Sequence, residues 1–94
     1  MRLLILEDNP KDVALAKETA HAEGFGDIEA FASLTPAIES IEQGLQGEKP
    51  LPDAFLVDLD LGSDSGYEFL RFWYRRRATS KVGVIVWSQL EERN

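Results

Sequence analysis

Three short runs of this chain are apolar at almost every position, and they limit the folds open to it more than any other feature. The runs are Leu3–Leu6, Ala54–Val57 and Val82–Trp87. Runs of this length are typical of strands that are covered on both faces of a sheet. A weaker run, Asp27–Phe31, predicts one more strand. The chain is therefore expected to build a sheet whose main strands are buried on both sides.

A helix is expected between the first two strands. Asn9 is a favourable N-cap, and Pro10 suits the first helical position because no backbone N–H is needed there. The helix should run to about Glu23 and stop at Gly24, because glycine readily ends helices. Its apolar side is expected to consist of Val13, Leu15, Ala16 and Ala20.

Two further helices are expected along the chain. Thr35-Pro36 repeats the pattern of a cap followed by proline and predicts the start of the second helix. The third is expected from Tyr67 to about Arg77, after a loop over Gly62–Gly66. The apolar residues at helical spacing are Ala37, Ile38, Ile41 and Leu45 on the second helix, and Phe69, Leu70, Trp73 and Tyr74 on the third. The basic run Arg75–Arg77 complements the dipole of the third helix, and its alternative interpretation is a docking patch for an acidic partner.

The expected elements alternate between strand and helix and begin and end with a strand. Alternation of this kind, with apolar strands, is typical of an α/β protein whose parallel sheet carries helices on both faces, the doubly wound arrangement. A chain of 94 residues has room for one such domain, and residues 1–94 are expected to form it. A hydrophobic content of 44% and a charged content of 29% are ordinary for a globular domain.

Charge and composition exclude several functions. Seventeen acidic and ten basic residues give a net charge of −7, which disfavours binding to nucleic acid or to anionic membranes. The absence of cysteine excludes disulfides, thiolate metal sites and cysteine nucleophiles. A single histidine, His21, cannot build a multi-histidine zinc site. Because no apolar run is long enough to span a membrane or to act as a signal peptide, a cytoplasmic location is expected.

Polar side chains follow the predicted strands at the point where each strand ends. Glu7 and Asp8 follow the first strand, Asp58 follows the third and Ser88 follows the fourth. The carboxyl ends of parallel strands meet at one edge of a sheet, where ligands bind. Carboxylates that converge there repel one another unless a cation lies between them, and oxygen ligands favour magnesium, manganese or calcium over zinc. A single acid at a strand end often only caps the next helix, but three of them on adjacent strands favour a metal site.

These motifs resemble those of response regulator receiver domains. Glu7-Asp8 after a leading apolar strand resembles the acidic pair of that family, and Pro52–Leu61 resembles the segment around its phosphoacceptor aspartate. Gly66 lies eight positions after Asp58, an offset that suits the family. The stretch Glu7–Val13 is similar to single-domain receivers of the phytochrome-partner type. The resemblance implies a flavodoxin-like sheet with the strand order 2-1-3-4.

The resemblance also implies a role for each residue of the motif. Asp58 would accept a phosphoryl group from a sensor histidine kinase or a phosphotransfer protein. Glu7, Asp8 and Asp58 would hold Mg²⁺, with Mn²⁺ as an alternative, together with the backbone carbonyl of Asp60. Ser88 would donate its hydroxyl to a phosphoryl oxygen. The chain would then be a signalling switch and not an enzyme with a separate substrate.

The sequence departs from the family pattern at several points. The last helix-strand-helix portion is missing, and with it the lysine that pairs with the phosphoryl group. Gly62 stands where the family usually has proline, and Asp60 adds a carboxylate close to the acceptor. These departures keep an alternative open, a receiver-like module that binds or dimerises without switching. A hydrolase that uses aspartyl chemistry lacks support, because its second aspartate would fall at Pro10.

The fourth predicted strand has a consequence for assembly. In the expected strand order, Val82–Trp87 would lie at an edge of the sheet and would leave backbone N–H and C=O groups unpaired. The strand contains no lysine or proline to protect this edge. The sequence therefore predicts a homodimer or a larger assembly through the edge of this strand.

Overall fold

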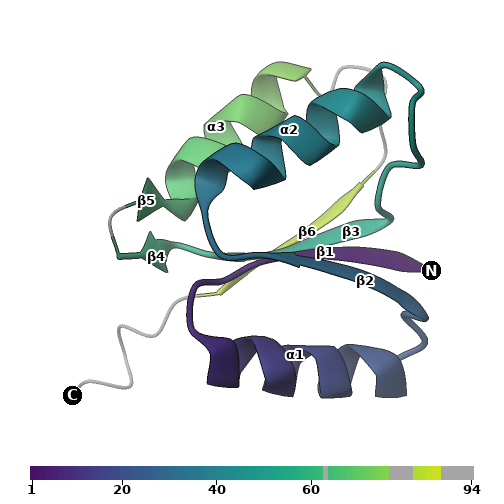
Figure 1. Cartoon of the computed structure of the whole chain (residues 1–94), viewed down its shortest axis with the longest axis vertical. Helices are drawn as coiled ribbons and strands as arrows, with labels where there is room; N and C mark the ends of the chain where they lie inside the picture. Colours follow the sequence, from purple (N-terminus) through teal and green to yellow (C-terminus); the bar gives the residue numbers. More distant parts are fainter. Residues whose placement is uncertain (63, 77–81, 88–94) are drawn as a thin grey trace.

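The computed structural model describes residues 1–62, 64–76 and 82–87. In chain order its elements are β1 (Arg2–Leu6), α1 (Pro10–Ala22), β2 (Asp27–Phe31), α2 (Leu34–Leu45), β3 (Ala54–Asp58), β4 (Asp60–Leu61), β5 (Asp64–Ser65), α3 (Gly66–Arg76) and β6 (Gly83–Trp87). The main sheet has the order β2-β1-β3-β6, and all its strands run parallel. Helix α1 covers one face, and α2 and α3 cover the other (Figure 1). The expected α/β class and strand order are confirmed.

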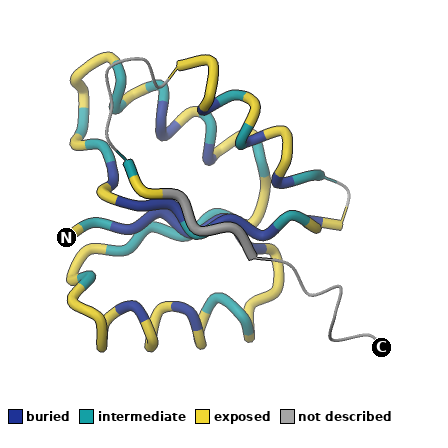
Figure 2. The backbone as a smooth tube through the Cα atoms, turned by 180° about the vertical axis from the view of Figure 1, so that it is seen from behind, coloured by how far each residue is buried: buried dark blue, intermediate teal, exposed yellow. Residues whose placement is uncertain are grey.

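The two faces of the sheet build two cores, because successive side chains of a strand point to opposite faces. On β1, Leu4 and Leu6 pack toward α2 and α3, whereas Leu3 and Ile5 pack toward α1. Figure 2 shows the resulting pattern, with buried residues concentrated in the central strands and along one side of each helix. The apolar runs of β1 and β3 therefore reflect strands that face a core on both sides.

Aromatic rings hold α3 against the sheet. The ring of Phe55 on β3 lies edge-on to that of Phe69, with centroids 5.1 Å apart, and to that of Trp73 at 4.9 Å. All three side chains are fully buried. Edge-to-face pairs of this kind add to the stabilisation that burial alone provides. These contacts place α3, and with it the turn that precedes it, at a defined position relative to the end of β3.

Two residues expected on apolar helix faces are exposed instead. Leu15 on α1 and Tyr74 on α3 each have a relative exposure of 59%. The buried residues of α1 are Ala16 and Ala20, one turn apart, and Leu15 is rotated around the helix axis by about 100° from Ala16 and by about 140° from Ala20. On α3, Tyr74 follows the buried Trp73 and is rotated away in the same manner. The predictions for these two side chains were wrong.

The segments around α2 and α3 also differ from the sequence-based expectation. Helix α2 begins at Leu34 and not after Thr35, and its N-cap residue Ser33 makes no side-chain capping bond. The backbone N–H of Leu34 donates instead to Oδ2 of Asp64, at 3.1 Å. The loop expected over Gly62–Gly66 contains β5, which pairs as an antiparallel strand with β4 just before the loop, and Gly66 is already the first residue of α3. A cap supplied by a residue thirty positions away cannot be found from local sequence.

Strand β6 forms an edge of the sheet built by the described strands. Its backbone pairs with β3 on one side, from Gly83 opposite Ala54 to Trp87 opposite Asp58. The assembly through this edge that the sequence predicts stays a prediction. Within the described ranges, no helix has the length and the apolar character needed to cross a bilayer.

Candidate metal centre

The register of the sheet brings two acids side by side. Strands β1 and β3 are parallel neighbours, and Leu6 is paired with Val57. The next residues along the two strands are Glu7 and Asp58, so they lie abreast of each other at the carboxyl edge of the sheet. Asp8 follows Glu7 as the chain leaves β1 toward α1. The position of the acids is thus a direct consequence of strand pairing.

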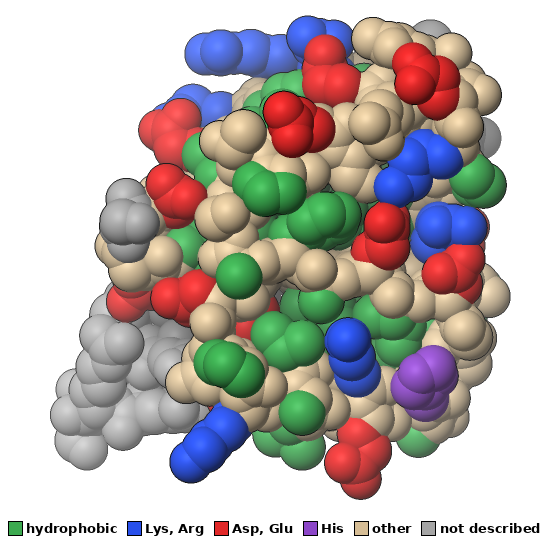
Figure 3. Space-filling view, in the orientation of Figure 1, with side chains coloured by type: hydrophobic (Ala, Val, Ile, Leu, Met, Phe, Trp, Pro, Cys, Tyr) green, Lys and Arg blue, Asp and Glu red, His purple; other side chains and the backbone are tan. Residues whose placement is uncertain are grey.

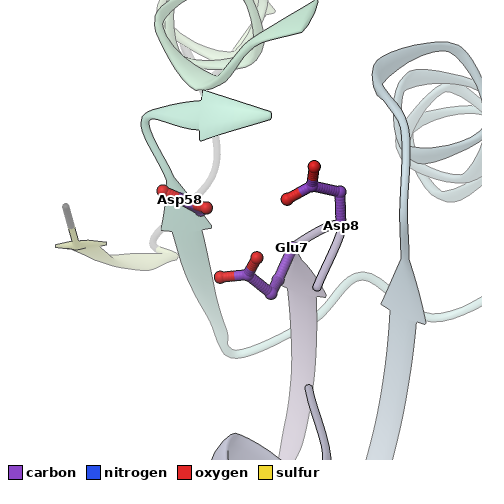
Figure 4. A group of neighbouring side chains, drawn as sticks. All are labelled: Glu7, Asp8 and Asp58. Carbon is purple, nitrogen blue, oxygen red and sulfur yellow. The ribbon is translucent and has the colours of Figure 1, made fainter. Parts of the chain in front are cut away.

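The three carboxylates converge. One oxygen from each of Glu7, Asp8 and Asp58 can be chosen such that all three atoms lie within 4.8 Å of one another. Figure 4 shows the three side chains gathered at the ends of two neighbouring strands. Glu7 and Asp58 are 4% and 5% exposed, whereas Asp8 is exposed. The cluster is therefore buried at its base and open to solvent on the side of Asp8.

Backbone N–H groups orient the two buried carboxylates. The N–H of Asn9 donates to Oε2 of Glu7, and the N–H of Asp60 donates to Oδ1 of Asp58, both at 3.0 Å. Asn9 has a second function, because its side chain accepts hydrogen bonds from Lys11 and Asp12 and caps α1 as expected. The sequence predicted the cap but gave no sign that the same residue positions Glu7.

Glu7 lies in surroundings that disfavour its charged form. Burial raises the pKa of Glu7 from 4.5 to about 7, and the charge of Asp58 and the nearby carboxyl groups of Asp8 and Asp58 act in the same direction. The N–H of Asn9 opposes this shift. Oε1 of Glu7 is buried and has no hydrogen-bond partner among the described residues. The site thus holds more negative charge than its own donors can neutralise.

The donor set fits a divalent cation that prefers oxygen ligands. Carboxylates are typical ligands of magnesium, manganese and calcium in proteins. Each of the three acids offers a carboxylate oxygen. A cation here would give the buried Oε1 of Glu7 the partner that it lacks. It would also offset the effects of burial and of the charge of Asp58, which raise the pKa of Glu7.

Asp60 and Gly62 shape the loop beside the site. Asp60 is exposed, and its side chain accepts a hydrogen bond from the N–H of Gly62 at 3.2 Å. Gly62 has a φ of +72°, a conformation that favours glycine, and a Cβ atom at this position would lie 3.4 Å from Oδ2 of Asp8. The carboxylate that departs from the family pattern is therefore tied into its own turn. Ser88, the other residue assigned to the site from the sequence, lies outside the described residues.

Beside the acids lies a cavity, which the sequence did not indicate. It has a volume of about 390 Å³, and Glu7 and Asp8 line it together with Val13 of α1 and Phe31 of β2. Its walls come from three separate elements, so no local motif could have predicted it. The cavity gives the acid cluster an open approach from the side of α1.

The comparisons with known proteins rest on structure. No model of a protein family matches the chain, and no curated protein sequence matches it. The response regulator MaeR bound to beryllium trifluoride superimposes with a TM-score of 0.70 at 22% identity, over 94% of this chain and 66% of that chain. A receiver domain of a putative LuxO repressor protein from Vibrio parahaemolyticus gives 0.73 at 25% identity, over 93% and 60%.

A third match carries a ligand-bound site. It is a response regulator from Burkholderia pseudomallei with a phosphorylated aspartic acid, a calcium ion and citrate, with a TM-score of 0.70 at 18% identity, over 94% of this chain and 46% of that chain. The chain thus spans between 46% and 66% of the length of these three proteins. The fold of this chain is therefore that of response regulator receiver domains.

Proposed function

We propose that this chain is the phosphoacceptor receiver of a two-component signalling system, with Asp58 as the acceptor. The observation that carries the proposal is the convergence of Glu7, Asp8 and Asp58 within 4.8 Å at the carboxyl edge of a sheet with the receiver fold. The beryllium trifluoride complex and the phosphorylated aspartate of two structural neighbours support it. The donor would be the phosphohistidine of a sensor histidine kinase or of a phosphotransfer protein.

The chemistry assigned to Asp58 is nucleophilic. A carboxylate oxygen of Asp58 attacks phosphorus, the P–N bond of the phosphohistidine breaks, and its electron pair returns to the imidazole, which takes up a proton from solvent. The N–H of Asp60 holds Oδ1 of Asp58 at 3.0 Å and so fixes the orientation of the attacking group. Phosphoryl transfer depends chiefly on such positioning and on electrostatic stabilisation.

Glu7 and Asp8 are assigned to bind Mg²⁺ with Asp58 and the backbone carbonyl of Asp60. When bound, the ion supplies the positive charge that phosphoryl oxygens require. Glu7 forms the buried base of the site, and the exposed Asp8 leaves one side open to an incoming donor. Ser88 is assigned the hydrogen bond to a phosphoryl oxygen. On this proposal the chain modifies only itself and is not an enzyme with a separate substrate.

The decisive experiment is mass spectrometry of the chain after incubation with acetyl phosphate and magnesium. The proposal expects one phosphate on the wild type, none after Asp58→Asn, and little in the presence of a chelator. The matched control is Asp53→Asn. Asp53 is an exposed acid that immediately precedes the first residue of β3, at the opposite end of the strand from Asp58. Asp53→Asn should be labelled like the wild type.

The second candidate, a receiver-like module that binds or dimerises without switching, makes the opposite prediction. A wild-type chain that acquires no phosphate, while an active receiver domain is labelled under the same conditions, would rule out the phosphoacceptor role. Asp60 favours this second candidate, because its exposed carboxylate lies two residues from the acceptor and adds negative charge on the side of an anionic donor.

A further inference from the structure

A groove runs between α2 and α3, on the face of the sheet opposite α1. Its apolar lining comes from Leu34 and Ile38 on α2 and from Phe72 on α3, all three of them partly buried against the core. The groove has a volume of about 270 Å³. This is below the roughly 300–1,000 Å³ of typical small-molecule sites, and it suits one or two side chains of a partner better than a free ligand.

Arginines surround this apolar lining. Arg71, Arg75 and Arg76 of α3 border the groove, together with a single acid, Glu68. Figure 3 shows lysine or arginine side chains along the upper edge of the molecule, over α3, with acidic side chains beside them. The three arginines at the groove belong to a chain whose net charge is −7. The groove is therefore a local site of positive charge on an acidic molecule.

Two of the arginines are available to a partner at small cost. Arg75 is exposed and has no acidic partner among the described residues, and Arg71 pairs only with Glu68. The side chains of Arg71 and Glu68 are 59% and 53% exposed, and exposed pairs of this kind contribute little stability. Arg71 could therefore leave Glu68 and pair with a carboxylate of a partner with little loss of stability.

Arg76 shapes the groove and is less available. Its guanidinium lies 5.7 Å from the ring centroid of Phe72 and pairs with Glu42 of α2 at 2.9 Å. It thus joins the two helices across the groove. The helix dipole explains why cations occur in the last turn of α3. It does not explain why Arg71, in the middle of the helix, borders the same apolar lining.

We propose that the groove between α2 and α3 binds an acidic amphipathic helix of a partner protein. Its apolar side chains would enter between Leu34, Ile38 and Phe72, and its carboxylates would pair with Arg71 and Arg75. Arginine suits this role because its planar guanidinium binds a carboxylate through two parallel hydrogen bonds. Helix-in-groove binding of this kind is a recurrent mode of peptide recognition. A long polyanion or an anionic membrane is disfavoured by the net charge of the whole chain.

The proposal is independent of phosphorylation and can be tested on the chain alone. The probe is a displayed library of random peptides of about sixteen residues, roughly four helical turns. The library is selected on the wild-type chain. Enriched peptides should carry apolar residues three or four positions apart, flanked by Asp or Glu. Titrated as synthetic peptides, they should bind Arg71→Glu/Arg75→Glu at least about tenfold more weakly.

The matched control is Lys17→Glu, a charge reversal at an exposed position of α1 on the other side of the sheet. It should bind the peptides like the wild type. If the arginine variant does not fold, NMR of the wild type provides the test. Bound peptide should shift the backbone amide signals of Leu34 and Ile38. Four outcomes would overturn the proposal: no enriched peptide, enrichment without acidic residues, equal loss in the control, or binding of anionic vesicles or duplex DNA in place of peptides.

Discussion

The backbones of Gly66 and Asp58 lie so close that a Cβ atom on Gly66 would be 2.1 Å from the carbonyl oxygen of Asp58. The carbonyl carbon of Asp58 and the Cα atom of Leu59 would each lie 2.9 Å from that Cβ position. In addition, the N–H of Gly66 donates to the carbonyl oxygen of Leu59 at 3.2 Å. The first residue of α3 is therefore packed directly against the strand end that carries the proposed phosphoacceptor.

This contact predicts that Gly66→Ala is strongly destabilising. The methyl group would meet backbone atoms, which cannot rotate away, so the start of α3 or the end of β3 must shift. We expect a loss of roughly 2–4 kcal/mol in the free energy of unfolding, measured by denaturant titration. Gly26→Ala is the control, since a Cβ atom there meets nothing within 4 Å. Similar midpoints for the two variants would contradict the prediction.

Divalent cations should stabilise the chain. Binding to the folded state alone raises stability by mass action, by about 2.7 kcal/mol when the ion is present at a hundred times its dissociation constant. Millimolar magnesium or manganese should therefore raise the melting temperature of the wild type, and Asp8→Asn or Asp58→Asn should reduce that rise. Glu48→Gln, an exposed acid away from the site, should respond as the wild type does. An equal rise in all four proteins would mean that the ion acts elsewhere.

Stability without divalent cations should depend on pH through Glu7. Its pKa is about 7 in the folded chain against 4.5 for an ordinary glutamate, so the folded state favours the protonated form. This stabilisation is complete below about pH 4.5 and is lost as the pH rises through about 7. Glu7→Gln cannot ionise, and relative to the wild type it should gain up to roughly 3 kcal/mol between about pH 5 and pH 8.

The measurement is denaturant unfolding at several pH values in the presence of a chelator, with the wild type and the variant compared at each pH. Glu18→Gln, an exposed acid on α1, controls for the loss of one carboxylate from an acidic chain. A constant difference between Glu7→Gln and the wild type across this range would show that Glu7 is ionised throughout. The predicted magnesium effect should also weaken at low pH, because binding requires the carboxylate form.

The cap of α2 offers a separate test of the fold. Asp64→Ala removes the acceptor for the N–H of Leu34, and helix caps are worth about 1 kcal/mol. Ser33→Ala should have a much smaller effect, because the side chain of Ser33 makes no capping bond although it occupies the N-cap position. The opposite ranking of the two variants in a denaturant titration would indicate that the cap is local.

Much of the site could be predicted from the sequence because strand periodicity and strand ends are local features. The apolar run Leu3–Leu6 and the run Ala54–Val57 predicted two strands, and the acids that follow them fell at the carboxyl edge of the sheet. The side-by-side placement of Glu7 and Asp58 then needs only parallel pairing in a common register. For the same reason the α/β class could be predicted, whereas the order of the main strands was implied only by the resemblance to receiver domains.

The tertiary structure alone decided the features that depend on residues far apart in the chain. The cap of Leu34 by Asp64, the exposure of Leu15 and the arginine-bordered groove between α2 and α3 each depend on how the helices pack. The same holds for the pKa of Glu7, which is raised by burial and by the charge of Asp58 on another strand. Local sequence specifies elements and their ends, whereas burial, long-range capping and electrostatic coupling arise only when those elements pack together.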